Sequence, residues 1–195
     1  IYYLCSMKNI KKIDSITKLL IFALIYLSSI FVALTCNGQE RVYELEKIIF
    51  KKVNEFRMSE GLSPVKWDDK VYDAAHHHAL YISKRGIQVS HYEIESVYDK
   101  ENFVEMERAQ DRIKHYYHEN AWGIECITNI NFVWYKGDLE KIAEWTVNAW
   151  INSPNHRKGL LFESPSGTSL KFGAVSVLKV VDSCEWARPV LVLVN

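Results

Sequence analysis

This 195-residue sequence has no excess charge of either sign, because it contains 24 Lys and Arg residues and 24 Asp and Glu residues. Proteins that bind nucleic acid usually carry a basic face, so this balance argues against nucleic acid as a partner. The sequence also lacks internal repeats, low-complexity tracts and a Gly-rich phosphate loop. Its apolar fraction of 48% is sufficient for one sizeable core. We therefore expect a single globular domain that does not bind nucleotide phosphates through such a loop.

Cysteine is scarce as well. Of the four cysteines, Cys5 and Cys36 fall in the N-terminal region, which leaves Cys126 and Cys184 in the rest of the chain. Oxidation is permitted in an exported domain, so a Cys126–Cys184 disulfide is the simple expectation. Two buried free thiols are the alternative.

Long apolar runs are limited to one, LLIFALIYLSSIFVAL at residues 19–34, which follows a lysine-bearing start. This anatomy is typical of a secretory leader. At 16 residues, this run is longer than the apolar core of most signal peptides. It is shorter than the stretch of about 20 residues that a membrane-spanning helix needs. We predict that residues 1–38 are a signal peptide or an N-terminal membrane anchor. The protein is then secreted or held in the cell envelope, periplasmic or membrane-anchored, and meets the membrane only through this segment.

The remaining chain shows helical periodicity followed by strand-like runs. Apolar residues recur every three or four positions over 42–60, 69–84 and 139–150, and Gly61 and Asp138 are suited to end and begin helices. Residues 90–122 show no clean period and are expected to form a long loop with helical pieces. Two β-branched runs, KFGAVSVLKVV and RPVLVLVN, predict neighbouring strands. This order of elements predicts an α+β protein, a three-layer helix-sheet-helix domain.

Short motifs follow one another in order between about residues 45 and 177. They are NEFRMSEGLSPVKWDD, AAHHHA, the Ser90-His91 pair, the Glu119-Asn120 step, WINSPNHR and FGAVSV. Each motif is weak alone, but the ordered set resembles the CAP superfamily of cysteine-rich secretory, antigen-five and pathogenesis-related proteins, in particular its bacterial branch. The resemblance implies an SCP-like extracellular domain over residues 39–195, folded as a three-layer α-β-α sandwich of CAP type.

The resemblance also implies a cleft with two histidines and two acids. Its histidines correspond to His91 and His156, and its first acid corresponds to Glu119. The position of the second acid is Ser153 in this sequence, so the set of four is incomplete. Any mechanism that needs two carboxylates is therefore in doubt.

The local sequence around His156 predicts a neutral imidazole. Ser153 is a good N-cap and Pro154 suits the first helical position, which places His156 in the first turn of a short helix. The helix dipole disfavours a positive charge there. With Glu119 beside them, neutral His91 and His156 could hold Zn²⁺ or another divalent ion. His78, on an apolar helix face, is expected to be a hydrogen-bonded core residue instead.

Two functions are compatible with these features. The first is an exported binding or interaction module whose cleft takes a small molecule, a lipid, a protein or a divalent ion. The second is a hydrolase, either metal-assisted or using Glu119 and a histidine as base and acid. The incomplete acid pair favours the first. So does the absence of an activated nucleophile, because Ser90 and His91 are merely adjacent in sequence.

Overall fold

The computed structural model describes residues 42–84, 87–94, 106–162, 169–181, 183 and 185–195. The chain divides into two compact units, Ile1–Asn37 and Gly38–Asn195, and all of the described residues belong to the second. In this described part, no helix combines the length and apolar character needed to cross a bilayer. The leader expected at residues 1–38 lies outside the described residues and stays a prediction.

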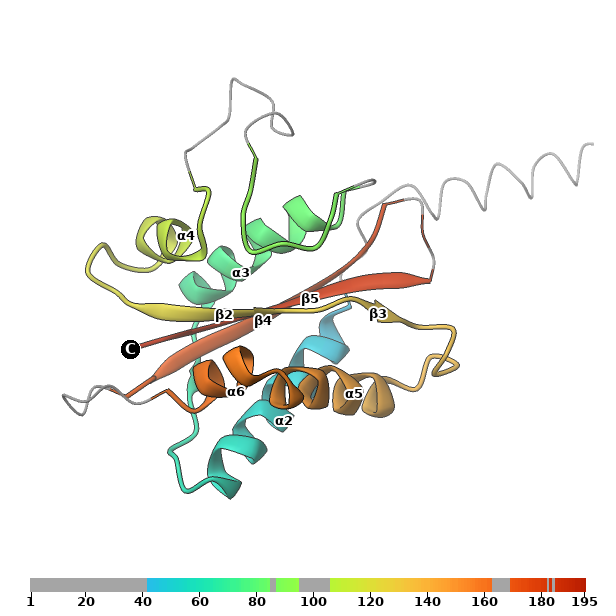
Figure 1. Ribbon diagram of the computed structural model, residues 1–195, viewed down its shortest axis with the longest axis horizontal. Helices are drawn as coiled ribbons and strands as arrows, with labels where there is room; N and C mark the ends of the chain where they lie inside the picture. The colour runs from blue at the N-terminus through green and yellow to red at the C-terminus, as the bar shows by residue number, and fades with distance from the viewer. Residues whose placement is uncertain (1–41, 85–86, 95–105, 163–168, 182, 184) are drawn as a thin grey trace, which may run out of the picture. The chain divides into compact units, whose positions relative to one another are not determined.

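A five-stranded sheet forms the middle of the unit, in the order β1-β4-β5-β2 with β3 also paired to β5 (Figure 1). The strands are β1 (Lys66–Trp67), β2 (Gly123–Ile127), β3 (Ile130–Asn131), β4 (Phe172–Lys179) and β5 (Trp186–Val194). β4 and β5 are antiparallel neighbours, with Val175 opposite Leu191. The prediction that the two β-branched runs pair in one sheet is confirmed.

Helices cover both faces of this sheet (Figure 1). One layer contains α2 (Tyr43–Ser59), α5 (Leu139–Asn152) and α6 (Pro154–Leu160). The other contains α3 (Asp69–Ile82) and α4 (Ala109–Tyr116), which pack against each other. The predicted α+β, three-layer α-β-α sandwich is confirmed.

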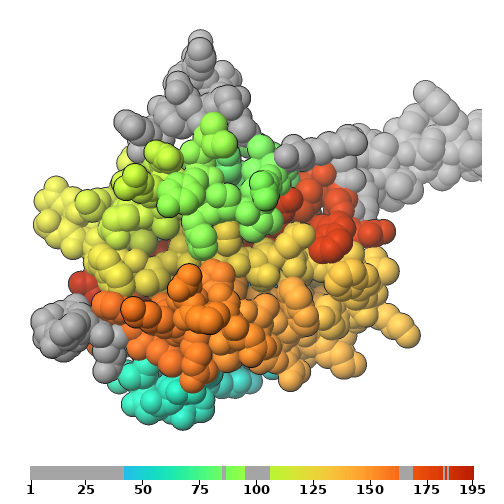
Figure 2. All heavy atoms as spheres, viewed as in Figure 1, coloured from blue at the N-terminus to red at the C-terminus, as the bar shows by residue number. Residues whose placement is uncertain are grey.

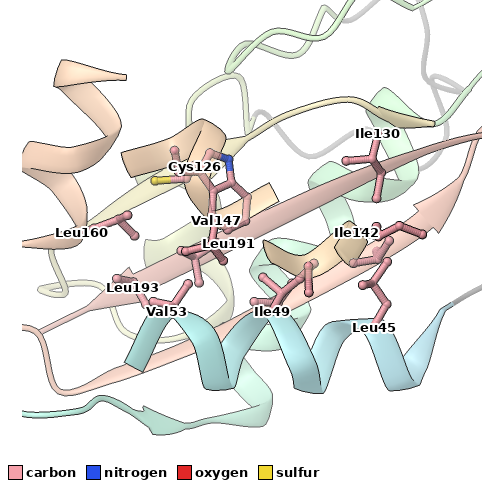
Figure 3. Packing of buried hydrophobic residues seen from close by; sticks show 14 of the residues in the cluster. Leu45, Ile49, Val53, Cys126, Ile130, Ile142, Val147, Leu160, Leu191 and Leu193 are labelled. Carbon is pink, nitrogen blue, oxygen red and sulfur yellow. The ribbon is translucent and has the colours of Figure 1, made fainter. Parts of the chain in front are cut away.

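Each face of the sheet has its own core, because successive strand residues point to opposite faces. On the α2 side, Figure 3 shows Leu45, Ile49 and Val53 directed toward the strands and α5, where they join buried residues of both. On the α3 side, alternate residues of β4 and β5 pack with the apolar face of α3. The described residues of both cores all belong to Gly38–Asn195, so we expect this unit to fold when it is produced without residues 1–37.

The ends of the helices follow local sequence signals. Gly61, with φ +83°, lies just beyond α2, where a left-handed residue ends a helix easily. Asp138 caps α5 by accepting a hydrogen bond from the Lys141 amide at 3.2 Å. Ser153 occupies the N-cap of α6 and Pro154 its first turn, but the Ser153 side chain makes no capping hydrogen bond. The expected side-chain cap is therefore absent from this position.

Cys126 is a free cysteine, completely buried in the core on the α2 side. Burial first, and the charge of Glu125 second, raise the pKa of its thiol. The structure thus has a buried free thiol at Cys126, in place of the expected disulfide. Cys184, the expected partner, lies outside the described residues.

Candidate functional site

A cleft of about 830 Å³ opens over β2, between α4 and α6. Figure 2 shows this face, with α4 coloured yellow-green and α6 coloured orange. His91, Ser153 and His156, all predicted from the sequence, line this cleft together. His91 comes from the segment after α3, whereas Ser153 and His156 come from the N-terminal end of α6. The sheet therefore brings together residues that are more than 60 positions apart.

The two imidazole rings face each other across the cleft. The Nε2 atoms of His91 and His156 are 3.5 Å apart, and the ring planes are inclined at 58°. The His91 side chain is 42% exposed, and His156 is partly exposed as well. Both Nε2 atoms thus meet at one point that a ligand can reach from solvent.

The carboxylate beside His91 is Glu125 of β2, not Glu119. A Glu125 oxygen lies 2.9 Å from His91 Nδ1, and the Glu125 side chain is 1% exposed. The structure places Glu119 in the turn after α4, where it is exposed and does not line the cleft. The physical reason is the position of each residue relative to β2. Glu119 lies in a surface turn before this strand, whereas Glu125 lies within the strand, which forms the floor of the cleft.

Arg112 of α4 holds Glu125 from the buried side. Its guanidinium donates to a Glu125 oxygen at 2.8 Å and to the carbonyl of His91 at 3.2 Å. It also donates to the carbonyl of Met106 at 3.0 Å and lies 3.3 Å from a Glu93 oxygen. Arg112 is 1% exposed. One buried cation therefore binds both the backbone of His91 and the carboxylate that orients its ring.

Glu93 extends this network to the histidines of α3. Its carboxylate lies 2.7 Å from His78 Nδ1 and 3.1 Å from His77 Nε2. The other ring nitrogen of His78 lies 2.8 Å from the carbonyl of Ser90, next to His91 in sequence. His78 is completely buried, so the prediction of a hydrogen-bonded core histidine is confirmed.

The ionisation of Glu125 determines which proton His91 carries. Burial raises the pKa of Glu125, but the charges of His78 and Arg112, with hydrogen bonds from His91 and Arg112, outweigh it and lower the pKa. An ionised carboxylate can only accept hydrogen bonds, so His91 Nδ1 donates to it. In a neutral His91 the lone pair then lies on Nε2. That lone pair is directed at the cleft and at His156.

The pKa of His156 is lowered from 6.5 by burial and then by the nearby charge of His91, although Glu125 acts in the opposite direction. We expect NMR titration of metal-free protein to give a His156 pKa below 6.5, which rises in His91→Gln. Folding lowers this pKa, so the unfolded chain binds a proton at His156 more readily than the folded protein does. The free energy of unfolding should therefore decrease as pH falls from 6.5 through the pKa of His156 in the folded protein. A His156 pKa that does not change in His91→Gln would contradict this assignment.

The histidine pair fits two of the ligand positions of a zinc ion. Zinc binds imidazole nitrogen at about 2.0–2.1 Å in tetrahedral geometry, which requires two such nitrogens about 3.3–3.4 Å apart. The observed Nε2 separation is 3.5 Å. A zinc-bound histidine also commonly donates its second N–H to a carboxylate, as His91 does to Glu125. Within the described ranges no group of three or more His, Cys, Asp or Glu side chains has metal-holding geometry. The pair His91 and His156 would therefore supply two ligands, without a third from these residue types.

Sequence reasoning missed the acidic and basic residues below the histidine pair. Glu125 stands between Ile124 and Cys126 in a strand whose neighbours are apolar, and a charged residue inside such a strand signals a buried partner. Arg112 and Glu93 lie in the stretch read as a long loop, and no spacing rule connects them. Their association depends on α4 packing beside β2.

The chain is similar to known proteins in both sequence and structure. A family model described as "CAP: Cysteine-rich secretory protein family" matches residues 50–164. Among solved structures, an outer surface protein from Borrelia burgdorferi is similar with a TM-score of 0.58 and 19% identity, over 81% of this chain and 98% of that chain. This likeness supports the fold.

A weaker likeness is to an extracellular protein containing an SCP domain from Bacillus anthracis. Its TM-score is 0.49 and its identity is 16%, over 76% of this chain and 40% of that chain. The comparison with curated proteins found no match.

Proposed function

The chain belongs to the cysteine-rich secretory protein (CAP) family, and from this premise we propose that it is an exported binding module whose cleft holds a ligand at His91 and His156. The observation that carries the proposal is the 3.5 Å approach of their two Nε2 atoms in a solvent-reached cleft. Export is supported by the apolar run at residues 19–34. It is also in keeping with the similar Borrelia burgdorferi protein being an outer surface protein.

A divalent cation such as Zn²⁺ is the ligand that the histidine pair fits best. Both Nε2 atoms are available to it, and Glu125 holds the His91 ring in position beside the cleft. A cleft of about 830 Å³ is much larger than one ion. The same site therefore has room for a small organic molecule or a lipid headgroup beside the cation.

Zinc titration of the Gly38–Asn195 unit by calorimetry tests this proposal. We expect His91→Ala and His156→Ala each to reduce zinc affinity at least tenfold, because each removes one of two protein ligands. Glu125→Gln should weaken affinity by about 10- to 100-fold, the usual effect of losing the carboxylate behind a metal-bound histidine. Binding should also weaken at pH values below 6.5, because protons compete with the metal for His156, whose pKa is lowered from that value.

The matched control is His115→Ala, which removes an exposed histidine of α4 that does not line the cleft. It should bind zinc as the wild type does, and all four variants should show cooperative thermal unfolding. Unchanged affinity in both His91→Ala and His156→Ala would show that the cleft pair is not the metal site.

Hydrolysis is the second candidate function, and the His91–Glu125 contact favours it. A histidine oriented by a buried carboxylate can accept a proton from an attacking water, and His91 keeps its Nε2 lone pair directed at the cleft. Ser153 also lines the cleft, but within the described part of the chain its hydroxyl makes no hydrogen bond to either ring. Turnover of a panel of esters and peptides that is abolished in both His91→Gln and Glu125→Gln would establish hydrolysis.

A further inference from the structure

Exposed large apolar side chains gather at a second place, away from the cleft. Trp134 is 69% exposed and Val133 is 58% exposed, and both lie in the turn between β3 and α5. The Trp134 ring meets the Trp186 ring at a centroid distance of 5.6 Å. Trp145 of α5 is also exposed and lies 6.5 Å from the Tyr135 ring. We call Val133, Trp134, Trp145 and Trp186 the aromatic tip.

The turn that carries this tip is held in a defined conformation. Asn131, which is 5% exposed, accepts hydrogen bonds on its side-chain oxygen from the amides of Val133 at 2.9 Å and Trp134 at 3.2 Å. The Gly137 amide closes the turn by donating a hydrogen bond to the carbonyl of Phe132 at 3.2 Å. Gly137 has φ +74°, a conformation that glycine adopts without strain. The turn therefore presents Val133 and Trp134 to solvent by its own hydrogen bonding.

We propose that the aromatic tip is a membrane-contacting surface that inserts into the interfacial region of a lipid bilayer. Tryptophan is enriched at membrane–water interfaces because its ring is apolar while its N–H remains hydrated. Lys136 and Lys179 lie beside the tip, with the Lys179 amine 6.0 Å from the Phe132 ring centre. Glu185 also lies beside the tip, as does Asp138, which pairs with Lys141 at 3.1 Å. The surroundings of the tip therefore carry both signs of charge, which suits zwitterionic lipid.

The position of Val42, where the described part of the chain begins, supports a lipid bilayer as the partner of the tip. Val42, the residue before α2, donates a hydrogen bond to the carbonyl of Val177 at 3.1 Å. Val177 precedes Lys179 by two residues on β4, which places the entry point at the same end of the sheet as the tip. Seven residues, 35–41, separate the apolar run from Val42 and span at most about 25 Å. A retained apolar run would therefore hold this end of the domain close to the bilayer.

The same geometry determines where the cleft would lie. Figure 1 shows the turn between β3 and α5 at the end of the sheet opposite α6. Along β5, Trp186 belongs to the tip and Val192 pairs with Glu125 of the cleft. Six residues of strand correspond to about 20 Å. Contact through the tip therefore leaves the His91–His156 cleft open to solvent above the membrane, independently of what the cleft binds.

The test uses the full chain reconstituted in phosphatidylcholine vesicles, with part of the lipid brominated on its acyl chains. All six tryptophans lie between Trp67 and Trp186, so quenching by bromine reports on the domain and not on residues 1–38. We expect the brominated lipid to quench wild-type emission. In Trp134→Phe the quenched fraction should fall at least twofold, and the Val133→Ser/Trp134→Ser double variant should lose nearly all of it.

The matched control is Trp122→Phe, which changes an exposed tryptophan at the cleft and should leave the quenched emission unchanged. Near-ultraviolet circular dichroism of each variant verifies folding. Absence of quenching in the wild type overturns the proposal, as does an equal loss in Trp134→Phe and Trp122→Phe. Self-association of the Gly38–Asn195 unit that depends on Trp134, without quenching, would assign the tip to a second copy and would overturn it too.

Discussion

Arg112→Met is expected to lower the free energy of unfolding by about 3–5 kcal/mol, the usual cost of removing one partner from a buried ionic network. Arg112 is 1% exposed and lies between the carboxylates of Glu93 and Glu125, at 3.3 and 2.8 Å. Methionine preserves the apolar volume of the stem but removes the guanidinium that both buried acids contact. Urea denaturation of the Gly38–Asn195 unit measures this loss.

Arg157→Met is the matched control. Arg157 pairs with Glu60 at 2.8 Å, but their side chains are 39% and 35% exposed, and solvent-screened pairs contribute at most about 1 kcal/mol. The Arg112 variant should also weaken the zinc binding that we propose, because it releases the backbone of His91 and its orienting carboxylate. A loss no greater than that of Arg157→Met would contradict the view that Arg112 holds the floor of the cleft.

Trp150→Ala is expected to cost about 3–5 kcal/mol of unfolding free energy, the range for truncation of a large buried aromatic residue. Trp150 is completely buried and is among the largest side chains of the core on the α2 side. It also lies in the last turn of α5, three residues before Ser153, the N-cap of α6. A cavity there should loosen the helix that carries His156, so zinc affinity should fall together with stability.

Trp134→Ala provides the comparison for Trp150→Ala. It removes the same side chain from a site that is 69% exposed, so the change should be about 0.5 kcal/mol, as for surface substitutions generally. Denaturant midpoints at unchanged slope compare the two variants directly. Equal destabilisation of both would show that the core on the α2 side does not depend on Trp150.

Most helices could be predicted because their signals are local. Apolar residues at three- and four-residue spacing indicated α2, α3 and α5, and Gly61 and Asp138 lie at the helix ends that they predicted. The C-terminal strands were predicted from β-branched runs. The two shortest strands, β1 and β3, were not, because two residues have no detectable period and are defined only by pairing with β4 and β5.

The cleft was predicted in part, through the ordered motifs. His91, Ser153 and His156 line one cleft as the resemblance implied, but Glu119 lies outside it. The motif assigned the first acid to Glu119, whereas the carboxylate that contacts His91 is that of Glu125. That contact depends on the register of β2 against β5, in which Glu125 pairs with Val192 in the interior of the sheet.

The sequence alone therefore determined the layers, their order and the two histidines, because helical periodicity, strand propensity and short motifs are properties of neighbouring residues. Only the tertiary structure decided the chemical surroundings of those histidines. Arg112, Glu93 and Glu125 come from α4, a loop and β2, and their charges are stable only where packing removes water and brings them within hydrogen-bond distance. The aromatic tip has the same origin, because Trp134 and Trp186 meet only after β3 pairs with β5.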